Sequence, residues 1–150
     1  MSIRNEIPAR HDLFEYVGEV AIGKEGIDDN NHLNYKRYLP IYERQRDLFM
    51  ATCGIDSKAL RKDLGLRIVM ESDSSKFIKE VIEGDRIKIC TSAEIAGARL
   101  QFRQRMIRDG TEVSNSQCIL CVKNVSGVTR LPDVIKNKIN HVNLTKQPKQ

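Results

Sequence analysis

The sequence predicts an α+β fold in which one long helix packs against an antiparallel sheet of five strands. Two observations carry this prediction. Apolar residues recur at intervals of three and four across residues 35–52, and strand-like runs separated by glycine-containing turns fill most of the later chain. A chain of 150 residues, 40% of them hydrophobic, suits one domain. We expect this domain over residues 1–130, with a short helix and a polar tail over residues 131–150.

The first strand is expected over residues 14–22, where apolar and polar residues alternate loosely. A loop then ends in residues 27–34, a segment rich in Asp and Asn of the kind that forms turns and caps helices. The long helix follows over residues 35–52. Because Pro40 lacks a backbone donor, we expect a kink or a loose first turn before it.

The later chain is β-rich, and a short amphipathic segment at residues 57–63 leads into it. The predicted strands are residues 66–71 with a continuation through 77–81, 86–95, 99–108 and 112–124. Turn signals separate them, and Asp109-Gly110 between two strand-like runs is a strong hairpin signal. In the run 86–95 the apolar residues alternate with polar ones, so one face of the sheet is expected to be buried.

The charge of the chain favours anionic partners. Its 25 Lys and Arg against 20 Asp and Glu give a net charge of +5 and a pI near 9.1. Basic residues are scattered, only 5% of residues are aromatic and there is no Trp, so a base-stacking platform is poorly supplied. We therefore expect no nucleic-acid partner, and the phosphates of coenzyme A remain a candidate.

The cysteines suggest neither a metal site nor a redox dithiol. Cys118 and Cys121 form a C-x-x-C pair inside a predicted strand, where positions three apart point to opposite faces. They are expected to be buried structural thiols. No other grouping has convincing zinc spacing, so we expect neither metal nor cofactor.

Two features favour a cytoplasmic protein without a membrane partner. Residues 1–12 mix charged side chains with few apolar ones, unlike a secretory signal. No later stretch approaches the roughly 20 apolar residues of a membrane span.

The candidate for chemistry is the loop before the long helix, which carries Asp28, Asn30 and His32 as Asp-x-Asn-x-His. A carboxylate can activate water or attack a carbonyl directly, and an imidazole can orient it. Amide donors and the N-terminus of the helix can stabilise an oxyanion. The same residues also suit a structural role, since Asp and Asn cap helices and fix turns, and Asn34 suits a cap best.

Over about residues 14–124, the chain resembles the acyl-CoA thioesterases of the hot-dog superfamily, including the 4-hydroxybenzoyl-CoA thioesterase type. The positions that carry the resemblance are Asp28, His32, Asn34, Tyr38, Glu43 and Arg46. The Asp-x-Asn-x-His loop also resembles that of the plant acyl-ACP thioesterases. One departure is Asn31, where many members have Gly. Another is that the plant enzymes carry two such domains in one chain.

The resemblance implies a single hot-dog domain, a long helix wrapped by the sheet, that hydrolyses an acyl-CoA or acyl-ACP thioester. It implies Asp28 as general base or nucleophile, with Asn30 and His32 assisting. Glu80 resembles by position a strand glutamate that acts as a second acid or base. It also implies Asn34 and Tyr38 in substrate binding, and assembly as a homodimer or homotetramer that completes the acyl site.

Other residues and functions are weighed against this. Glu43 and Arg46, three apart on the helix, are interpreted as a scaffold pair. His11 and His141 lie outside the cluster and are interpreted as surface residues. One alternative is a hot-dog hydratase. The motif of such hydratases resembles Asp-x-Asn-Pro-x-His, and this loop lacks the Pro. A non-catalytic acyl-CoA-binding module remains the other alternative.

Overall fold

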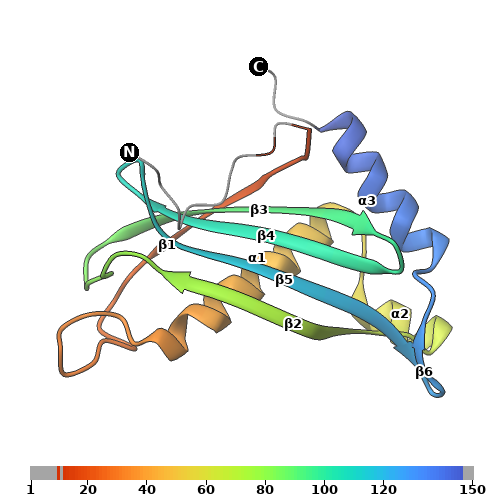
Figure 1. Cartoon of the computed structure of the whole chain (residues 1–150), viewed down its shortest axis with the longest axis horizontal. Helices are drawn as coiled ribbons and strands as arrows, with labels where there is room; N and C mark the ends of the chain where they lie inside the picture. Colours follow the sequence, from red (N-terminus) through yellow and green to blue (C-terminus); the bar gives the residue numbers. More distant parts are fainter. Residues whose placement is uncertain (1–9, 11, 147–150) are drawn as a thin grey trace.

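A computed structural model describes residue 10 and residues 12–146, and it contains an antiparallel sheet wrapped around one long helix (Figure 1). The expectations for His11, for the first nine residues and for the tail beyond residue 146 lie outside the described residues. The elements in chain order are β1 (Tyr16–Ala21), η1 (Tyr35–Arg37), α1 (Tyr38–Thr52), α2 (Ser57–Leu64), β2 (Arg67–Phe77), β3 (Arg86–Ala96), β4 (Arg99–Arg108), β5 (Thr111–Asn124), β6 (Gly127–Thr129) and α3 (Asp133–Thr145). The predicted α+β hot-dog architecture is confirmed.

The sheet has the order β1-β3-β4-β5-β2, and the short strand β6 pairs with β5. The hairpin predicted at Asp109-Gly110 joins β4 to β5, and both residues have positive φ, 50° and 78°. The sequence predicted five strands and missed β6, which is only three residues long. Within the described residues, β2 pairs with a strand on one side only, which leaves it at an edge of the sheet.

The start of the long helix differs from the prediction of a helix that begins at residue 35. A 3-10 turn, η1, precedes α1, and Asn34 caps it through a hydrogen bond from the Lys36 N–H to Asn34 Oδ1 at 3.0 Å. Pro40 falls in the first turn of α1, where backbone N–H groups have no partner within the helix. The expected loose first turn is therefore present as a 3-10 segment.

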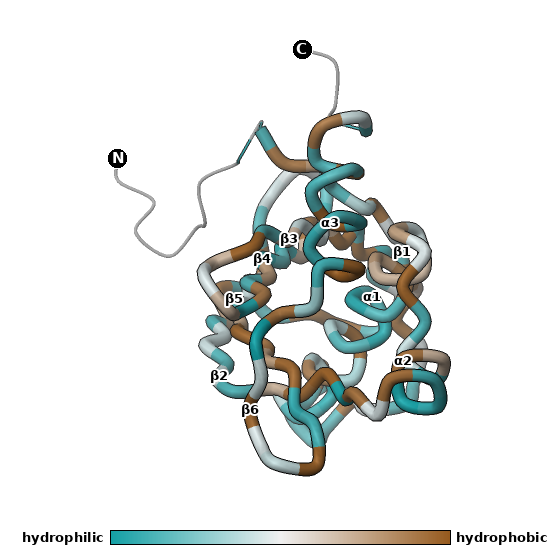
Figure 2. The backbone as a smooth tube through the Cα atoms, turned by 90° about the vertical axis from the view of Figure 1, so that its right-hand side faces the viewer, coloured by the Kyte–Doolittle hydropathy of each residue, from teal (hydrophilic) through white to brown (hydrophobic). Residues whose placement is uncertain are grey.

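The core lies between the sheet and the helices, which share one side of the sheet (Figure 2). Alternate residues of β4 turn toward the helices and are almost fully buried: Leu100, Phe102, Gln104 and Met106. One hydrophobic cluster surrounds Phe49 and Phe102 and includes Ile135 and Ile139 of α3. A second cluster, around Tyr42, lies at the end that carries the loop of residues 26–34.

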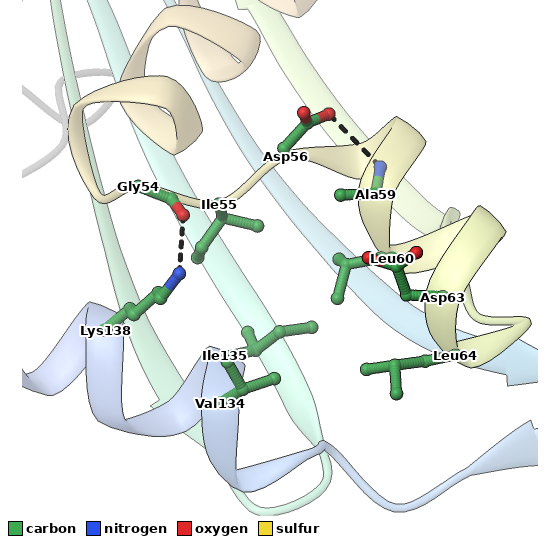
Figure 3. A pocket seen from close by; sticks show the side chains of 10 residues that line it. All are labelled: Gly54, Ile55, Asp56, Ala59, Leu60, Asp63, Leu64, Val134, Ile135 and Lys138. Carbon is green, nitrogen blue, oxygen red and sulfur yellow. Dashed lines mark hydrogen bonds between the residues drawn. The ribbon is translucent and has the colours of Figure 1, made fainter.

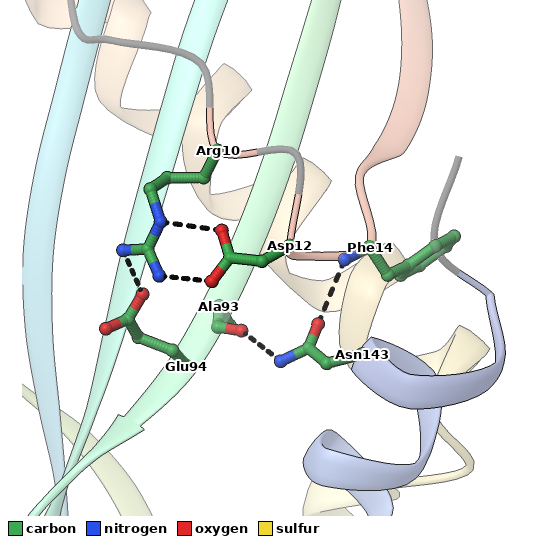
Figure 4. A network of polar contacts seen from close by, with 6 residues as sticks. All are labelled: Arg10, Asp12, Phe14, Ala93, Glu94 and Asn143. Atoms are coloured by element: carbon green, nitrogen blue, oxygen red, sulfur yellow. Dashed lines mark hydrogen bonds and ion pairs between the residues drawn. The ribbon is translucent and has the colours of Figure 1, made fainter. Parts of the chain in front are cut away.

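The C-terminal helix is longer than the short pattern at residues 134–139 indicated. Asn143, near its end, has a side-chain oxygen that accepts the Phe14 N–H at 3.0 Å, and its amide nitrogen donates to the Ala93 carbonyl at 2.9 Å (Figure 4). Beside it, Arg10 pairs with Glu94 of β3 at 2.8 Å. These contacts fix α3 and the segment before β1 against β3. In the part of the chain that the structure describes, no helix is long and apolar enough to cross a membrane.

Candidate active site

The loop of residues 26–34 is a narrow hairpin that projects between β1 and η1. At its base, the Asn34 N–H donates to the Gly26 carbonyl at 2.9 Å. Closer to its tip, the Asp28 N–H donates to the His32 carbonyl at 3.0 Å. This backbone ladder places Asp28 and His32 opposite each other on the two sides of one tight turn.

Asn31 stands at the position where many loops of this kind have glycine. Its φ is +66°, in the left-handed region that glycine enters freely and asparagine tolerates better than most residues. The Asn31 N–H donates to the Asp28 carbonyl at 3.0 Å, which closes the turn. Asn31 is therefore compatible with the left-handed conformation that this turn requires.

Asp28 has both a structural contact and a free oxygen. Its Oδ1 accepts the Asn30 N–H at 2.9 Å, an Asx-type turn. Among the described residues, its Oδ2 accepts no hydrogen bond, and the side chain is half-buried. The Asn30 side chain is exposed. The turn fixes the carboxylate and leaves one oxygen available to a ligand.

Glu80 and His32 lie together although they are far apart in sequence. His32 Nε2 and Glu80 Oε1 are 3.9 Å apart, and the two side chains are 30% and 75% exposed. Their backbones are held in register one residue further on, where the Leu33 N–H donates to the Val81 carbonyl at 2.6 Å. Asp28, His32 and Glu80, all predicted from sequence, thus come from one loop and the strand-to-strand connection beside it.

Asn34 and Tyr38 follow the loop but differ in accessibility. Asn34 uses its side-chain oxygen as the helix cap described above. Tyr38 is only 3% exposed, and burial raises the pKa of its hydroxyl. Its ring meets Phe77 edge-on, with the ring centroids 4.8 Å apart. Tyr38 therefore belongs to the buried core beside the loop, in the cluster that includes Leu33.

An exposed aromatic surface beside the loop was not predicted. Phe77, at the end of β2, is 47% exposed, and its ring also meets that of Tyr35, which is 60% exposed. Large apolar groups left in solvent commonly mark a contact surface. The sequence signal was weak, because each aromatic is isolated in the chain and only the fold brings them together.

Glu43 and Arg46 do not form the scaffold pair that their spacing suggested. Arg46 instead donates to Gln104 Oε1 at 3.0 Å, and Gln104 is held by bonds to the Tyr42 carbonyl and to Thr91 Oγ1. No ion pair joins Glu43 to Arg46 within the described residues. Both line a groove of about 270 Å³ between α1 and the edge strand β2, together with Asp47, Met50, Ser57, Ile68, Met70, Phe102 and Leu120.

A second hollow lies between α2 and α3, at the opposite end of the molecule from the loop (Figures 1 and 3). Two of its polar side chains have structural partners. Lys138 donates to the Gly54 carbonyl at 2.6 Å, and Asp56 caps α2 by accepting the N–H groups of Lys58 and Ala59. Asp63 also lines this hollow, whose lining contains neither His nor Cys among the described residues.

The cysteines are free and buried. Burial raises the pKa of Cys118 to about 11, and that of Cys53 likewise to about 11, so both thiols stay protonated at neutral pH. Among residues 10 and 12–146, no group of three or more His, Cys, Asp or Glu side chains could hold a metal ion.

A comparison with protein families shows which family the chain belongs to. The model of the thioesterase-like superfamily matches residues 22–139, most of the chain. This chain belongs to the thioesterase-like superfamily. Membership assigns it to the thioester hydrolases, and the loop of residues 26–34 falls inside the matched range. A comparison with curated protein sequences found no significant match.

Solved structures share the fold at low sequence identity. A 1,4-dihydroxy-2-naphthoyl-CoA thioesterase from Synechocystis has a TM-score of 0.77 at 11% identity, over 87% of this chain and 98% of that one. A DHNA-CoA thioesterase from Staphylococcus aureus has a TM-score of 0.76 at 14% identity, over 90% and 97%. A hypothetical protein from Staphylococcus aureus in complex with CoA has a TM-score of 0.77 at 21% identity, over 92% and 87%.

Proposed function

We propose that the protein hydrolyses an acyl-CoA thioester at the loop of residues 26–34, with Asp28 as general base or nucleophile. The observation that carries the proposal is the state of the Asp28 carboxylate. One oxygen is fixed by the Asn30 N–H at 2.9 Å, and the other faces no partner among the described residues. A fixed carboxylate with one free oxygen is what water activation or direct attack requires.

Two chemical routes fit this carboxylate. As a base, Asp28 takes a proton from water while the water oxygen bonds to the thioester carbonyl carbon. The tetrahedral intermediate then expels the thiolate, which takes up a proton, and the products are a carboxylic acid and a free thiol. As a nucleophile, Asp28 bonds to the same carbon and expels the thiolate, and water then hydrolyses the mixed anhydride to the acid.

His32 and Glu80 supply the second part of the proposal. We assign His32 to orienting the attacking water or the substrate, since its backbone pairs with that of Asp28 across the turn, with the Asp28 N–H donating to the His32 carbonyl at 3.0 Å. Glu80 Oε1 lies 3.9 Å from His32 Nε2, so we assign the two side chains to the same side of the substrate site.

The oxyanion needs donors that other groups have not already taken. The Lys36 N–H is used by Asn34 Oδ1 and the Arg37 N–H by the Asn34 carbonyl. We therefore assign oxyanion stabilisation to the side-chain amide of Asn30 and the N–H of Tyr35. Asn34 and Tyr38 then act at the edge of the substrate site, as the family resemblance implied.

We also propose that two chains pair through β2. This strand is 11 residues long, pairs on one side only within the described residues, and ends beside exposed Phe77 and Tyr35. Edge strands of this kind pair readily with another chain. A homodimer, or a homotetramer built from it, would cover the groove between α1 and β2 that Arg46 lines. Light scattering on the purified protein checks this, and a monomer at micromolar concentration would contradict it.

Release of free thiol from a panel of short, long and aromatic acyl-CoA thioesters, and from acyl-ACP, tests the proposed function. We expect turnover on at least one acyl-CoA. Binding of an acyl-CoA that remains intact would instead favour a non-catalytic binding module. Turnover on acyl-ACP alone would show that the acyl carrier is ACP and not CoA, and the proposed hydrolysis of the thioester would stand.

A further inference from the structure

We propose that Arg108, paired with Asp85, is the positioning residue of this site, and that it sets the placement of Glu80 beside His32. The inference rests on the proposed function for its effect on turnover. Its structural part, the register between the loop of residues 26–34 and the β2–β3 connection, can be tested without any substrate.

The side chain of Arg108 joins two parts of the β2–β3 connection. Its Nη1 donates to Asp85 Oδ2 at 2.7 Å and to the backbone carbonyl of Glu80 at 2.7 Å. The Arg108 and Asp85 side chains are 25% and 16% exposed, so water screens this pair only partly. The Arg108 guanidinium, at the end of β4, thus binds the backbone of Glu80, the residue whose carboxylate lies near His32.

Asp85 completes the clamp from the other end of the connection. Its Oδ2 also accepts the Ile82 N–H at 2.9 Å, and its backbone carbonyl accepts the Ile22 N–H at 2.8 Å. The connection is therefore folded back on itself and attached to the end of β1. Arg108 and Asp85 together hold both ends of residues 80–85.

Val81 transmits this placement to the loop of residues 26–34. It is 1% exposed and follows Glu80 directly. Its carbonyl accepts the Leu33 N–H at 2.6 Å, and Leu33 directly follows His32. A shift of the Glu80 backbone would move both partners of the His32–Glu80 contact relative to each other.

The chain offers a matched control on the same strand. Arg105 pairs with Glu15 at 2.8 Å, and their side chains are 20% and 27% exposed, close to the values for Arg108 and Asp85. Glu15 precedes β1, and neither residue contacts the loop or the β2–β3 connection through a side-chain hydrogen bond among the described residues. Arg105→Met therefore removes a similar ion pair without touching the site.

The test compares Arg108→Met with Arg105→Met in the full chain. We expect Arg108→Met to lower kcat by about 10- to 100-fold with KM changed less than about threefold, because small displacements of catalytic groups cost up to about 10²-fold. Arg105→Met should keep kcat within about twofold. Arg108→Lys, which keeps the charge and can reach either acceptor, should recover part of the loss.

Hydrogen exchange of the Leu33 amide, followed by NMR, is the second readout. We expect its protection to fall at least tenfold in Arg108→Met and to stay unchanged in Arg105→Met. Equal protection and equal kcat in the two variants would overturn the inference. Should Arg108→Met fail to fold, Asp85→Asn replaces it with the same expectations and the same contradicting result. If the wild type cleaves no thioester, the proposed function fails, while the Leu33 exchange still decides this inference.

Discussion

At the scale of single residues, the site depends on small polar side chains whose first contacts are with their own backbone. Asp28 holds the Asn30 N–H and Asn34 caps η1, so the structural roles expected for Asp and Asn are present at both positions. These roles do not compete with chemistry. A carboxylate that is held by one oxygen loses less freedom when its other oxygen engages a substrate.

Asn31 gives a prediction at this scale. Its φ of +66° costs most non-glycine residues roughly 1–2 kcal/mol. We expect Asn31→Ala to lower the free energy of unfolding by about 1 kcal/mol and to lower kcat by disturbing the turn between Asp28 and His32. Urea denaturation and steady-state kinetics measure the two effects.

Asn31→Gly is the control, because glycine adopts this conformation without strain. It should keep the stability of the wild type to within about 0.5 kcal/mol, the scale of most surface substitutions. If the alanine and glycine variants were equally stable, the left-handed conformation of residue 31 would not be the reason that asparagine serves there.

At the scale of elements, the sequence predicted what local patterns control and missed what depends on distant contacts. The predicted strands 86–95 and 99–108 match β3 and β4 closely. The prediction that one face of β3 is solvated is wrong at the centre of the strand, where Cys90 and Ser92 are buried on the face opposite Thr91 and Ala93. The helix start was displaced from residue 35 to Tyr38, because Asn34 caps a 3-10 turn first. The strand β6 was missed, since three residues carry no readable period.

The approach of α1 to β1 gives a prediction at the scale of elements. A Cβ atom added at Gly18 of β1 would overlap with Oε1 of Gln45, a buried side chain of α1. We expect Gly18→Ala to lower the free energy of unfolding by about 1–3 kcal/mol, the usual cost of overpacking a core. Chemical denaturation measures it.

Gly23, just after β1, is the matched control for this substitution. A Cβ atom there would meet no heavy atom within 4 Å. Gly23→Ala should therefore change stability by less than about 0.5 kcal/mol. Equal losses at both positions would show that backbone freedom, and not the close packing of α1 on β1, decides the effect at Gly18.

At the scale of the whole molecule, the fold assembles the site from segments that the sequence could not connect. Asp28, Asn30 and His32 are recognisable together because they are close in the chain. Glu80 was suggested only by a loose resemblance, and its contact with His32 was not predicted. The clamp by Arg108 and Asp85 was not predicted, since it joins the end of β4 to the β2–β3 connection across 23 residues.

The central claim is that Asp28 performs the chemistry, and comparing kcat for Asp28→Asn and Asp29→Asn on the same acyl-CoA tests it most directly. Asp29 is the adjacent, exposed carboxylate of the same loop, so its variant makes the same change of charge. We predict that Asp28→Asn lowers kcat by about 10²- to 10⁴-fold, the contribution of a positioned base, and that Asp29→Asn stays within about threefold. Wild-type turnover in a folded Asp28→Asn variant would contradict the account.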